Sequence, residues 1–366
     1  MLIISNSKNQ NIKYNNNKQI KKVISCEICS KKNFIPIQNI GRIDRVGVYG
    51  HLNIVICTNC GHKFVNPRYI DDFYIRYYLK KYRKIAFGFT EPTKNYLNIQ
   101  KRRGEGIFNF YKKYFKKKGK MLDHGCASGG TMISWIKNGW DAYGFDPHTP
   151  SVKFGKKMLG LKIKNCFGEN VKYKNNEFDV VKSLGSLEHS YNINKSLNEI
   201  YRILKQKGFL IIRWRSDKII GSTLEYFNHN HYRYFTRKTW KLLLSKHNFK
   251  VISYTNLKLE RYNSYEYILA QKISKRKFTI KVSKNIINNE INKLKKINVN
   301  YLKICIKAKE NNLINSKDLN KKITFIKKNK LILLNNIVKS SVLRFFYEMK
   351  KFYEIVNKND NKFKTY

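Results

Sequence analysis

The sequence has few acidic residues. Among 366 residues, 24 are Asp or Glu and 75 are Lys or Arg, so the formal net charge is +51. A positive charge of this size indicates a nucleic-acid partner when it is clustered on one face. Here Lys is frequent in every part of the chain, together with Asn and Ile, and its density rises only mildly towards the end. We therefore interpret most of the charge as a compositional bias, with nucleic acid and an anionic membrane surface as the alternatives.

Long apolar runs are also missing. No stretch approaches the roughly 20 residues that a membrane-spanning helix needs. The first residues are apolar, but they lack the basic start and the small-residue cleavage site of an export signal. We therefore expect a cytoplasmic protein, whose membrane contacts, where it has any, are peripheral and at the inner face.

Four of the seven cysteines have the spacing of a metal site. Cys26 and Cys29 form one C-x2-C pair, and Cys57 and Cys60 form another. Two such pairs place four thiolates around one ion, and a closed four-sulfur site has no open position for catalysis. The sequence therefore predicts structural zinc, with free thiols or two disulfides as the alternatives. His62 is surplus to this set, and we expect it in the core or on the surface.

The composition divides the chain into five segments. We expect a disordered arm over 1–22, a zinc-ribbon-like module over 23–68, a helical connector over 69–118, a catalytic domain over 119–271 and a basic helical extension over 272–366. The aromatic and basic stretch within 335–366 favours a helix that packs on the main domain, with a helix that lies on an anionic membrane as the alternative.

Strand and helix patterns alternate through the catalytic segment. Strand-like runs occupy 120–123, 142–145, 161–166, 178–183, 209–214, 249–254 and 265–270. Helical stretches separate the first six, whereas the last two are too close for a helix between them and are expected to pair antiparallel. The sequence therefore predicts an α/β fold, with a doubly wound, seven-stranded, Rossmann-like sheet.

A turn of small residues follows the first of these strands. Asp123 ends the strand, and Gly125, Ala127, Ser128 and Gly129 come next, before a helix. Small residues allow a close approach of the backbone to a ligand, and the start of a helix offers free N–H groups. A dinucleotide site would need G-x-G-x-x-G, which this turn lacks. We predict a nucleoside-binding crevice at the carboxyl ends of the strands.

Three further polar residues are assigned to this crevice. Asp146 follows the second strand and could accept hydrogen bonds from two ribose hydroxyls, or simply form a turn with Pro147. Glu169 follows the third strand and could lie near a base, or be a solvated loop acid. Ser183 ends the fourth strand.

Two histidines are the candidate catalytic residues. His189 lies beyond the fourth strand, where a neutral imidazole could take a proton from an acceptor hydroxyl, or could simply pack the loop. His231 lies in a loop crowded with aromatic and basic residues. His229 and His231 could instead bind a metal, although no carboxylate stands nearby.

Together, these motifs resemble the class I S-adenosylmethionine-dependent methyltransferases. Residues 122–129 are similar to the family motif that binds the methionine end of the cofactor, except that Ala127 stands where many members have Gly. Asp146 matches the ribose-binding acid, and Glu169 the acid near the adenine. The Leu-Glu-His segment at 187–189 and residues 231–236 are similar to a branch that acts on sugars and small molecules, and the cysteine module resembles a subgroup tied to surface polysaccharides.

The resemblance implies methyl transfer from S-adenosylmethionine to a polar small molecule, most simply a sugar or a surface-glycan precursor. His189 or His231 would act as the base, and Zn²⁺ would be structural. Two alternatives stay open: an RNA methyltransferase, and a non-catalytic binding protein that keeps the fold. The acceptor is the least transferable part of such a resemblance.

Overall fold

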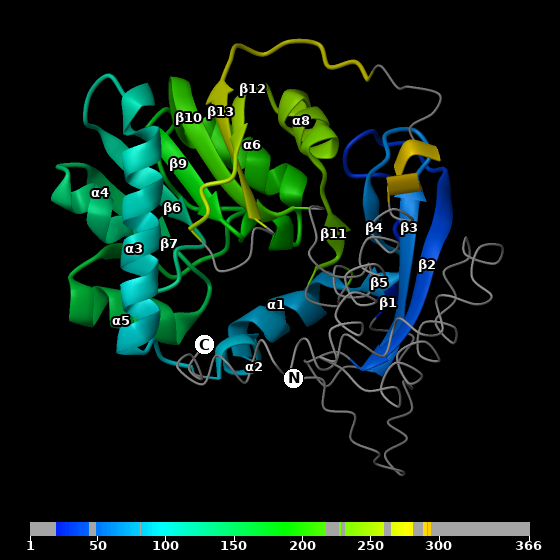
Figure 1. Cartoon of the computed structure of the whole chain (residues 1–366), viewed down its shortest axis with the longest axis horizontal. Helices are drawn as coiled ribbons and strands as arrows, with labels where there is room; N and C mark the ends of the chain where they lie inside the picture. Colours follow the sequence, from blue (N-terminus) through cyan, green and yellow to red (C-terminus); the bar gives the residue numbers. More distant parts are fainter. Residues whose placement is uncertain are drawn as a thin grey trace, which may run out of the picture.

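The computed structural model describes residues 20–43, 49–80, 82–88, 90–216, 227, 231–259, 265–280, 288–290 and 292–293. Within them, a large sheet flanked by helices and a smaller sheet lie on either side of helices α1 (Asp71–Lys80) and α2 (Tyr82–Phe87) (Figure 1). Of the predicted arm, only the last residues are described, and Ile20–Lys21 (β1) pairs with Arg68–Tyr69 (β5). Most of the predicted basic extension, including 335–366, lies outside the described residues.

The large sheet has seven strands in the order β12-β13-β10-β9-β6-β7-β8. Their bounds are β6 Lys120–His124, β7 Asp141–Phe145, β8 Lys162–Lys164, β9 Phe178–Leu184, β10 Leu204–Arg215, β12 Phe249–Thr255 and β13 Tyr265–Lys272. All neighbours pair parallel except β13, which is antiparallel to both β10 and β12. The predicted seven-stranded sheet and its antiparallel last pair are confirmed.

Consecutive strand residues face two separate cores. Met121 packs into one core and Leu122 into the other, as side chains in a strand alternate between faces. The helices divide accordingly (Figure 1): α3 (Lys94–Tyr111), α4 (Ile133–Lys137) and α5 (Thr149–Leu159) cover one face, and α6 (Ile193–Ile203) and α8 (Arg237–Lys246) cover the other. Short 3₁₀ turns occupy Lys112–Tyr114, Gly130–Met132 and Leu187–His189.

Helix α8 begins at Arg237, and Thr236 caps its first turn. The side chain of Thr236 accepts a hydrogen bond from the backbone N–H of Thr239, and the Thr239 hydroxyl accepts one from the backbone N–H of Thr236. This reciprocal cap satisfies donors that the first turn of a helix leaves unpaired. It also fixes the point at which the preceding loop ends.

The smaller sheet contains residues from two distant parts of the described chain. Its strands are β2 (Phe34–Ile43), β3 (Tyr49–Cys57), β4 (Lys63–Val65) and β11 (Arg233–Tyr234), in the order β11-β4-β3-β2. The first three belong to the cysteine module, whereas β11 comes from the segment between β10 and α8. Arg233 pairs antiparallel with Phe64. The segment that carries the catalytic candidate His231 therefore also completes the sheet of the cysteine module.

Candidate active site and metal centre

The small-residue turn and Asp146 lie together at the carboxyl edge of the large sheet. The backbone N–H groups of Gly125 and Cys126 donate to the carbonyl of Phe145, the last residue of β7, at 3.0 and 2.9 Å. The N–H of Ala127 donates to Oδ2 of Asp146 at 2.8 Å. We call residues 125–129 together with Asp146 the cofactor edge. Its members are brought together as the sequence predicts, although their contacts with a cofactor stay a prediction.

The turn depends on left-handed backbone conformations. The φ angles are +73° at Gly125, +54° at Ala127 and +79° at Gly129. Gly adopts such angles without a steric penalty, whereas an L-residue with a Cβ is strained there by about 1–2 kcal/mol. Ala127 therefore occupies a position that favours Gly.

Asp146 has an arginine beside it that sequence reasoning missed. Its Oδ1 accepts from the N–H of His148 at 2.9 Å, and a guanidinium nitrogen of Arg83 lies 3.7 Å from its Oδ2. The Arg83 side chain is 10% exposed, donates to the Tyr96 hydroxyl at 3.3 Å, and has no hydrogen-bond partner for its buried Nε. Arg83 comes from α2 and is one of 75 basic residues in the chain, so no sequence signal marks it.

Asp123 is held from within the protein. Its Oδ2 accepts from the Thr131 hydroxyl at 2.6 Å and forms an ion pair with Lys182, which is fully buried. Lys182 also donates to the Thr131 hydroxyl at 2.6 Å. Burial lowers the pKa of Lys182, although Asp123 opposes the shift. Asp123 therefore has an internal counter-ion, and any cofactor contact would have to share its carboxylate with Lys182.

Ser183 and Glu169 both hold loops at this edge. The Ser183 hydroxyl accepts from the N–H of Leu187 at 3.0 Å, and Glu169 accepts from the N–H of Asn192 at 3.2 Å. Burial raises the pKa of Glu169. The Ser128 hydroxyl, by contrast, is buried without a hydrogen-bond partner. The predicted cofactor roles of these three residues stay predictions.

The two candidate catalytic histidines lie against each other. The ring centroids of His189 and His231 are 4.5 Å apart at an interplanar angle of 69°. The Tyr78 hydroxyl, on α1, is 2.8 Å from Nδ1 of His189. Burial, then the charges of His189 and Arg215, lower the pKa of His231 well below its usual value, so it is neutral at pH 7. We call Tyr78, His189 and His231 the histidine cluster; His229 lies outside the described residues.

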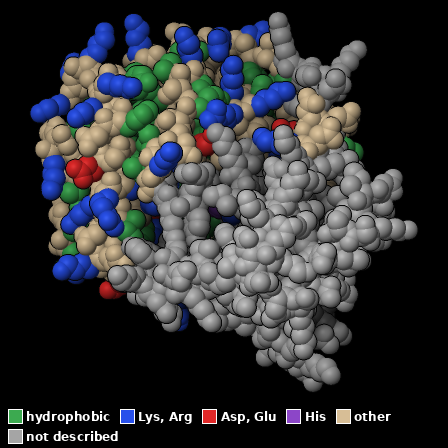
Figure 2. All heavy atoms as spheres, viewed as in Figure 1, with side chains coloured by type: hydrophobic (Ala, Val, Ile, Leu, Met, Phe, Trp, Pro, Cys, Tyr) green, Lys and Arg blue, Asp and Glu red, His purple; other side chains and the backbone are tan. Residues whose placement is uncertain are grey.

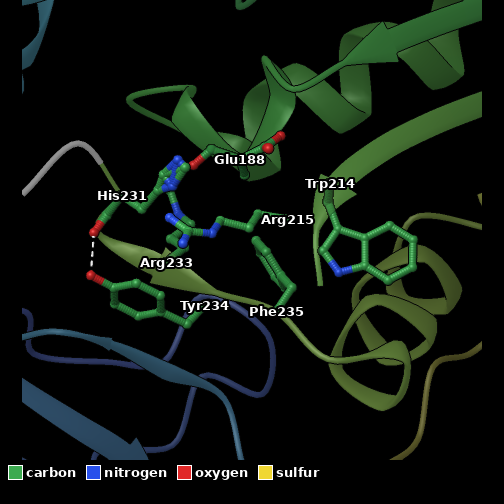
Figure 3. Close-up of a pocket in the computed structure, with 7 residues that line it drawn as sticks. All are labelled: Glu188, Trp214, Arg215, His231, Arg233, Tyr234 and Phe235. Carbon is green, nitrogen blue, oxygen red and sulfur yellow. Dashed lines mark hydrogen bonds between the residues drawn. The ribbon is translucent and has the colours of Figure 1, made fainter. Parts of the chain in front are cut away.

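A small cavity adjoins this cluster. Figure 3 shows His231 and Trp214 on opposite sides of it, with Glu188 above. Its volume is about 10 Å³, room for about one water molecule. Glu188 is 6% exposed, and its Oε2 has no hydrogen-bond partner. Burial raises the pKa of this carboxyl to about 7. Glu188 therefore changes charge near neutral pH, a property the sequence did not reveal.

The four predicted metal ligands converge. The Sγ atoms of Cys26, Cys29, Cys57 and Cys60 all lie within 4.8 Å of one another. The separation is 3.5 Å between Cys26 and Cys60, and 3.4 Å between Cys29 and Cys57. Tetrahedral zinc with Zn–S bonds of about 2.3 Å needs separations of about 3.7 Å. The four thiols therefore fit a structural zinc ion.

His62 stays outside this set of ligands. Its ring is buried and stacks between Phe64 and Phe235, at centroid distances of 5.5 and 4.8 Å. Burial lowers its pKa to about 3. Of the two alternatives for His62, core and surface, the structure shows the core.

Comparison with known proteins places a methyltransferase domain on this fold. Residues 98–254 match a family model described as a methyltransferase domain. No curated protein matches the sequence. The match confirms the prediction of a methyltransferase. Residues 98–254 include the cofactor edge, His189 and His231, whereas Tyr78 on α1 and Arg83 on α2 lie outside them.

Several solved structures are similar to the chain at low identity. A geranyl diphosphate C-methyltransferase from Streptomyces coelicolor is 13% identical, with 46% of this chain and 78% of that chain covered and a TM-score of 0.39. A 1,6-didemethyltoxoflavin-N1-methyltransferase from Burkholderia thailandensis is 18% identical, with 48% and 79% covered and a TM-score of 0.39. The [4+2]-cyclase SpnF is 14% identical, with 46% and 80% covered and a TM-score of 0.38. Similarity at this level says nothing about the substrate.

Proposed function

We propose that this protein transfers the methyl group of S-adenosylmethionine to a hydroxyl of a polar small molecule, a sugar or a surface-glycan precursor. One observation carries the proposal. The Ser186 hydroxyl donates to the carbonyl of His124 at 2.5 Å, and Ser186 lies against Gly125. The turn that carries His189 is therefore in direct contact with the cofactor edge, so a donor and an acceptor bound there would be neighbours.

The cofactor edge has capacity left for a nucleoside. A carboxylate offers about four lone-pair sites, and Asp146 uses two of them on backbone N–H groups. The remaining two can accept ribose hydroxyls. The cofactor would supply an activated methyl group. Arg83 and the backbone of residues 125–129 would orient it, and α2, which carries Arg83, would help to exclude water.

The histidine cluster suits a hydroxyl acceptor. A neutral imidazole can take the proton that a hydroxyl loses on methylation, with a gain of about 10²–10⁴ in rate. In our proposal His189 is this base, and the hydrogen bond between Tyr78 and Nδ1 of His189 holds its ring. Because His231 is neutral, it places no positive charge beside the base.

Calorimetric titration with S-adenosylmethionine tests the donor half. We expect Asp146→Asn to weaken binding about 10–100-fold, since a site that bonds hydroxyls loses about 1–3 kcal/mol when one partner is removed. His189→Gln should bind the cofactor as the wild type does. Unchanged affinity in Asp146→Asn would refute the assignment of Asp146.

A radiolabelled-methyl screen tests the acceptor half. Nucleotide sugars and total RNA are offered in parallel to the wild type and to His189→Gln. We expect label in a sugar with the wild type and a loss of about 10²–10⁴-fold with His189→Gln. Normal turnover by His189→Gln would reject this base, and label only in RNA would reject the sugar.

RNA is the second candidate because a basic groove exists. The groove, of about 550 Å³, includes Tyr143 and Tyr173 together with Lys156, Lys162, Lys164, Lys172 and Lys174. Aromatic and cationic side chains together favour single-stranded nucleic acid. However, Lys162 and Lys164 lie on the edge strand β8, where lysines prevent unwanted strand pairing. On the side of the molecule drawn in Figure 2, Lys and Arg of the described residues are scattered rather than gathered in one stripe.

Salt-dependent retention on RNA separates the two candidates, because counterion release makes phosphate binding steeply salt-dependent. A chain that bound no cofactor at all would instead be the non-catalytic binding protein.

Among the helices in the described part of the chain, none is both long and apolar enough to cross a membrane. A peripheral contact through 335–366 stays a proposal, and vesicle flotation with and without that segment tests it.

A further inference from the structure

One arginine connects the cysteine centre with the turn that carries His189. Arg233 lies on β11, and its side chain is fully buried. Its Nε and Nη2 donate to Oε2 and Oε1 of Glu27, both at 2.6 Å. Glu27 is the residue that follows Cys26 in the first C-x2-C pair. The guanidinium therefore binds the metal-binding loop through a bidentate ion pair.

The same side chain holds the turn on its other side. Nη1 of Arg233 donates to the carbonyl oxygens of Ser190, at 2.6 Å, and Glu188, at 3.2 Å. The Tyr232 hydroxyl lies 2.9 Å from the carbonyl oxygen of His189 and 2.6 Å from that of Ser190. The end of a helical turn leaves its carbonyls without partners of its own. Residues 232 and 233 supply partners for three consecutive carbonyls, and so set how His189 is presented.

Glu27 is fixed from several directions. Its carboxylate also accepts from Arg68 at 3.2 Å, and its backbone carbonyl accepts from Asn194 of α6 at 3.1 Å and from Lys246 of α8 at 2.8 Å. Burial disfavours the charged form of Glu27, but Arg233 and Arg68 outweigh it and hold its pKa below the usual range. Loss of one partner from such a buried pair leaves a charge uncompensated.

We propose that Arg233 is a positioning residue that couples the cysteine centre to His189. A metal ion at the four cysteines fixes the loop that carries Glu27, Glu27 orients Arg233, and Arg233 with Tyr232 holds the turn of His189. The catalytic meaning of this coupling rests on the proposed function, whereas the coupling itself does not. Because coupling between two sites is reciprocal, a change at Arg233 must also weaken metal binding.

Three variants test the coupling in the metal-loaded full chain. Arg233→Met removes the connection, and Glu27→Gln weakens only its half at the metal-binding loop. Arg237→Met is the matched control, because Arg237 also pairs with a buried carboxylate, that of Glu266, at 2.5 Å. The readouts are the rate of zinc release to a chromophoric chelator and the ring ¹⁵N resonances of His189, assigned with His189→Gln.

We expect Arg233→Met to release zinc about 10–100-fold faster than the wild type, the usual effect of removing a partner that supports metal ligands. The His189 resonances should move in Arg233→Met and, less far, in Glu27→Gln. Arg237→Met should change neither readout. Zinc release from Arg233→Met that is no faster than from Arg237→Met would overturn the proposal.

Removal of the metal provides the reverse measurement. Chelation of zinc from the wild type should move the His189 resonances in the same direction as Arg233→Met does. If the stripped chain unfolds, metal-loaded Glu27→Gln gives the answer, because it keeps all four thiols. Resonances that stay at the wild-type position in Glu27→Gln would refute the coupling. Failure of the wild type to bind S-adenosylmethionine would refute the proposed function. The zinc-release rates and the His189 resonances would still test the coupling.

Discussion

The cofactor edge and the histidine cluster are built in opposite ways. The cofactor edge comes from one continuous stretch, in which β6 and β7 are neighbours and the turn between them bonds back to Phe145 and Asp146. The histidine cluster draws Tyr78 from α1, His189 from a turn after β9 and His231 from the segment that leads to β11. The first depends on local backbone geometry and the second on contacts between distant segments. We therefore expect damage to the cysteine module to leave the cofactor edge intact and to disturb the histidine cluster.

The largest expected effect tests this contrast directly. Cys57→Ser removes one of four metal ligands, so the chain should lose its zinc and about 5 kcal/mol of stability, part of the roughly 10–16 kcal/mol that structural zinc supplies to zinc-finger peptides. Metal content by mass spectrometry and the free energy of unfolding in urea measure this. Cys166→Ser, a half-buried thiol outside the quartet, is the control. If Cys57→Ser lost its affinity for S-adenosylmethionine along with its zinc, the contrast between the cofactor edge and the histidine cluster would be refuted.

The buried ion pair between Lys182 and Asp123, next to the cofactor edge, should contribute to stability independently of the metal. Lys182→Met leaves the buried Asp123 without its counter-ion and should cost about 3–5 kcal/mol. The double variant Lys182→Met with Asp123→Leu should recover most of this loss, because both charges are gone. Urea unfolding compares the three proteins, and zinc content should stay unchanged. A double variant that is no more stable than the single one would show that the uncompensated charge of Asp123 is not the cause of the loss.

On the histidine side, Glu188 predicts a pH dependence. Burial raises its pKa from 4.5 to about 7 in the folded state. The stabilisation from its protonated form is therefore complete below pH 4.5 and is lost as the pH rises to 7. Relative to Glu188→Gln, the wild type should lose roughly 2–3 kcal/mol between these limits. Buried histidines such as His124 titrate in both proteins and cancel in the difference. Parallel stability curves for the two proteins would contradict a raised pKa.

The smallest effect concerns the turn itself. Ala127→Gly should stabilise the protein by about 0.5–1 kcal/mol, because the relief of strain at φ +54° exceeds the extra entropy that Gly has when unfolded. Ala142→Gly, in the buried strand β7, is the control and should destabilise by about 1 kcal/mol. Thermal unfolding resolves both changes. Equal losses in the two variants would show that Ala127 is not strained.

The predictable parts of this protein were those that repeat a pattern along the chain. Short strand-like runs that alternate with helical stretches located the seven strands, and the spacing of Cys26, Cys29, Cys57 and Cys60 located the metal ligands. Asp146 was placed at the crevice because it follows a strand directly. In each case, the physical cause acts over a few neighbouring residues, so the sequence displays it.

The other features of the fold and the site depend on contacts between residues that are distant in the sequence, and the order of residue types along the chain does not reveal such contacts. Lys182 lies within a strand of a Lys-rich chain, and nothing in the sequence shows that it is buried against Asp123. A strand of two residues has no detectable period, so β11 could not be anticipated. Tyr78 and Arg83 come from a connector rich in aromatic and basic residues, and only the folded structure distinguishes them from their neighbours.

The pairing of Arg233 with Phe64 also has a consequence for biosynthesis. The two cysteine pairs and strands β2 to β4 are close in sequence and can assemble as soon as they leave the ribosome. Their sheet cannot gain its last strand until five strands of the large sheet have been made. Contacts between residues so far apart form slowly, because a long loop must close first. During synthesis, the small sheet of the metal-binding module therefore keeps one edge, that of β4, unpaired until β11 has been made.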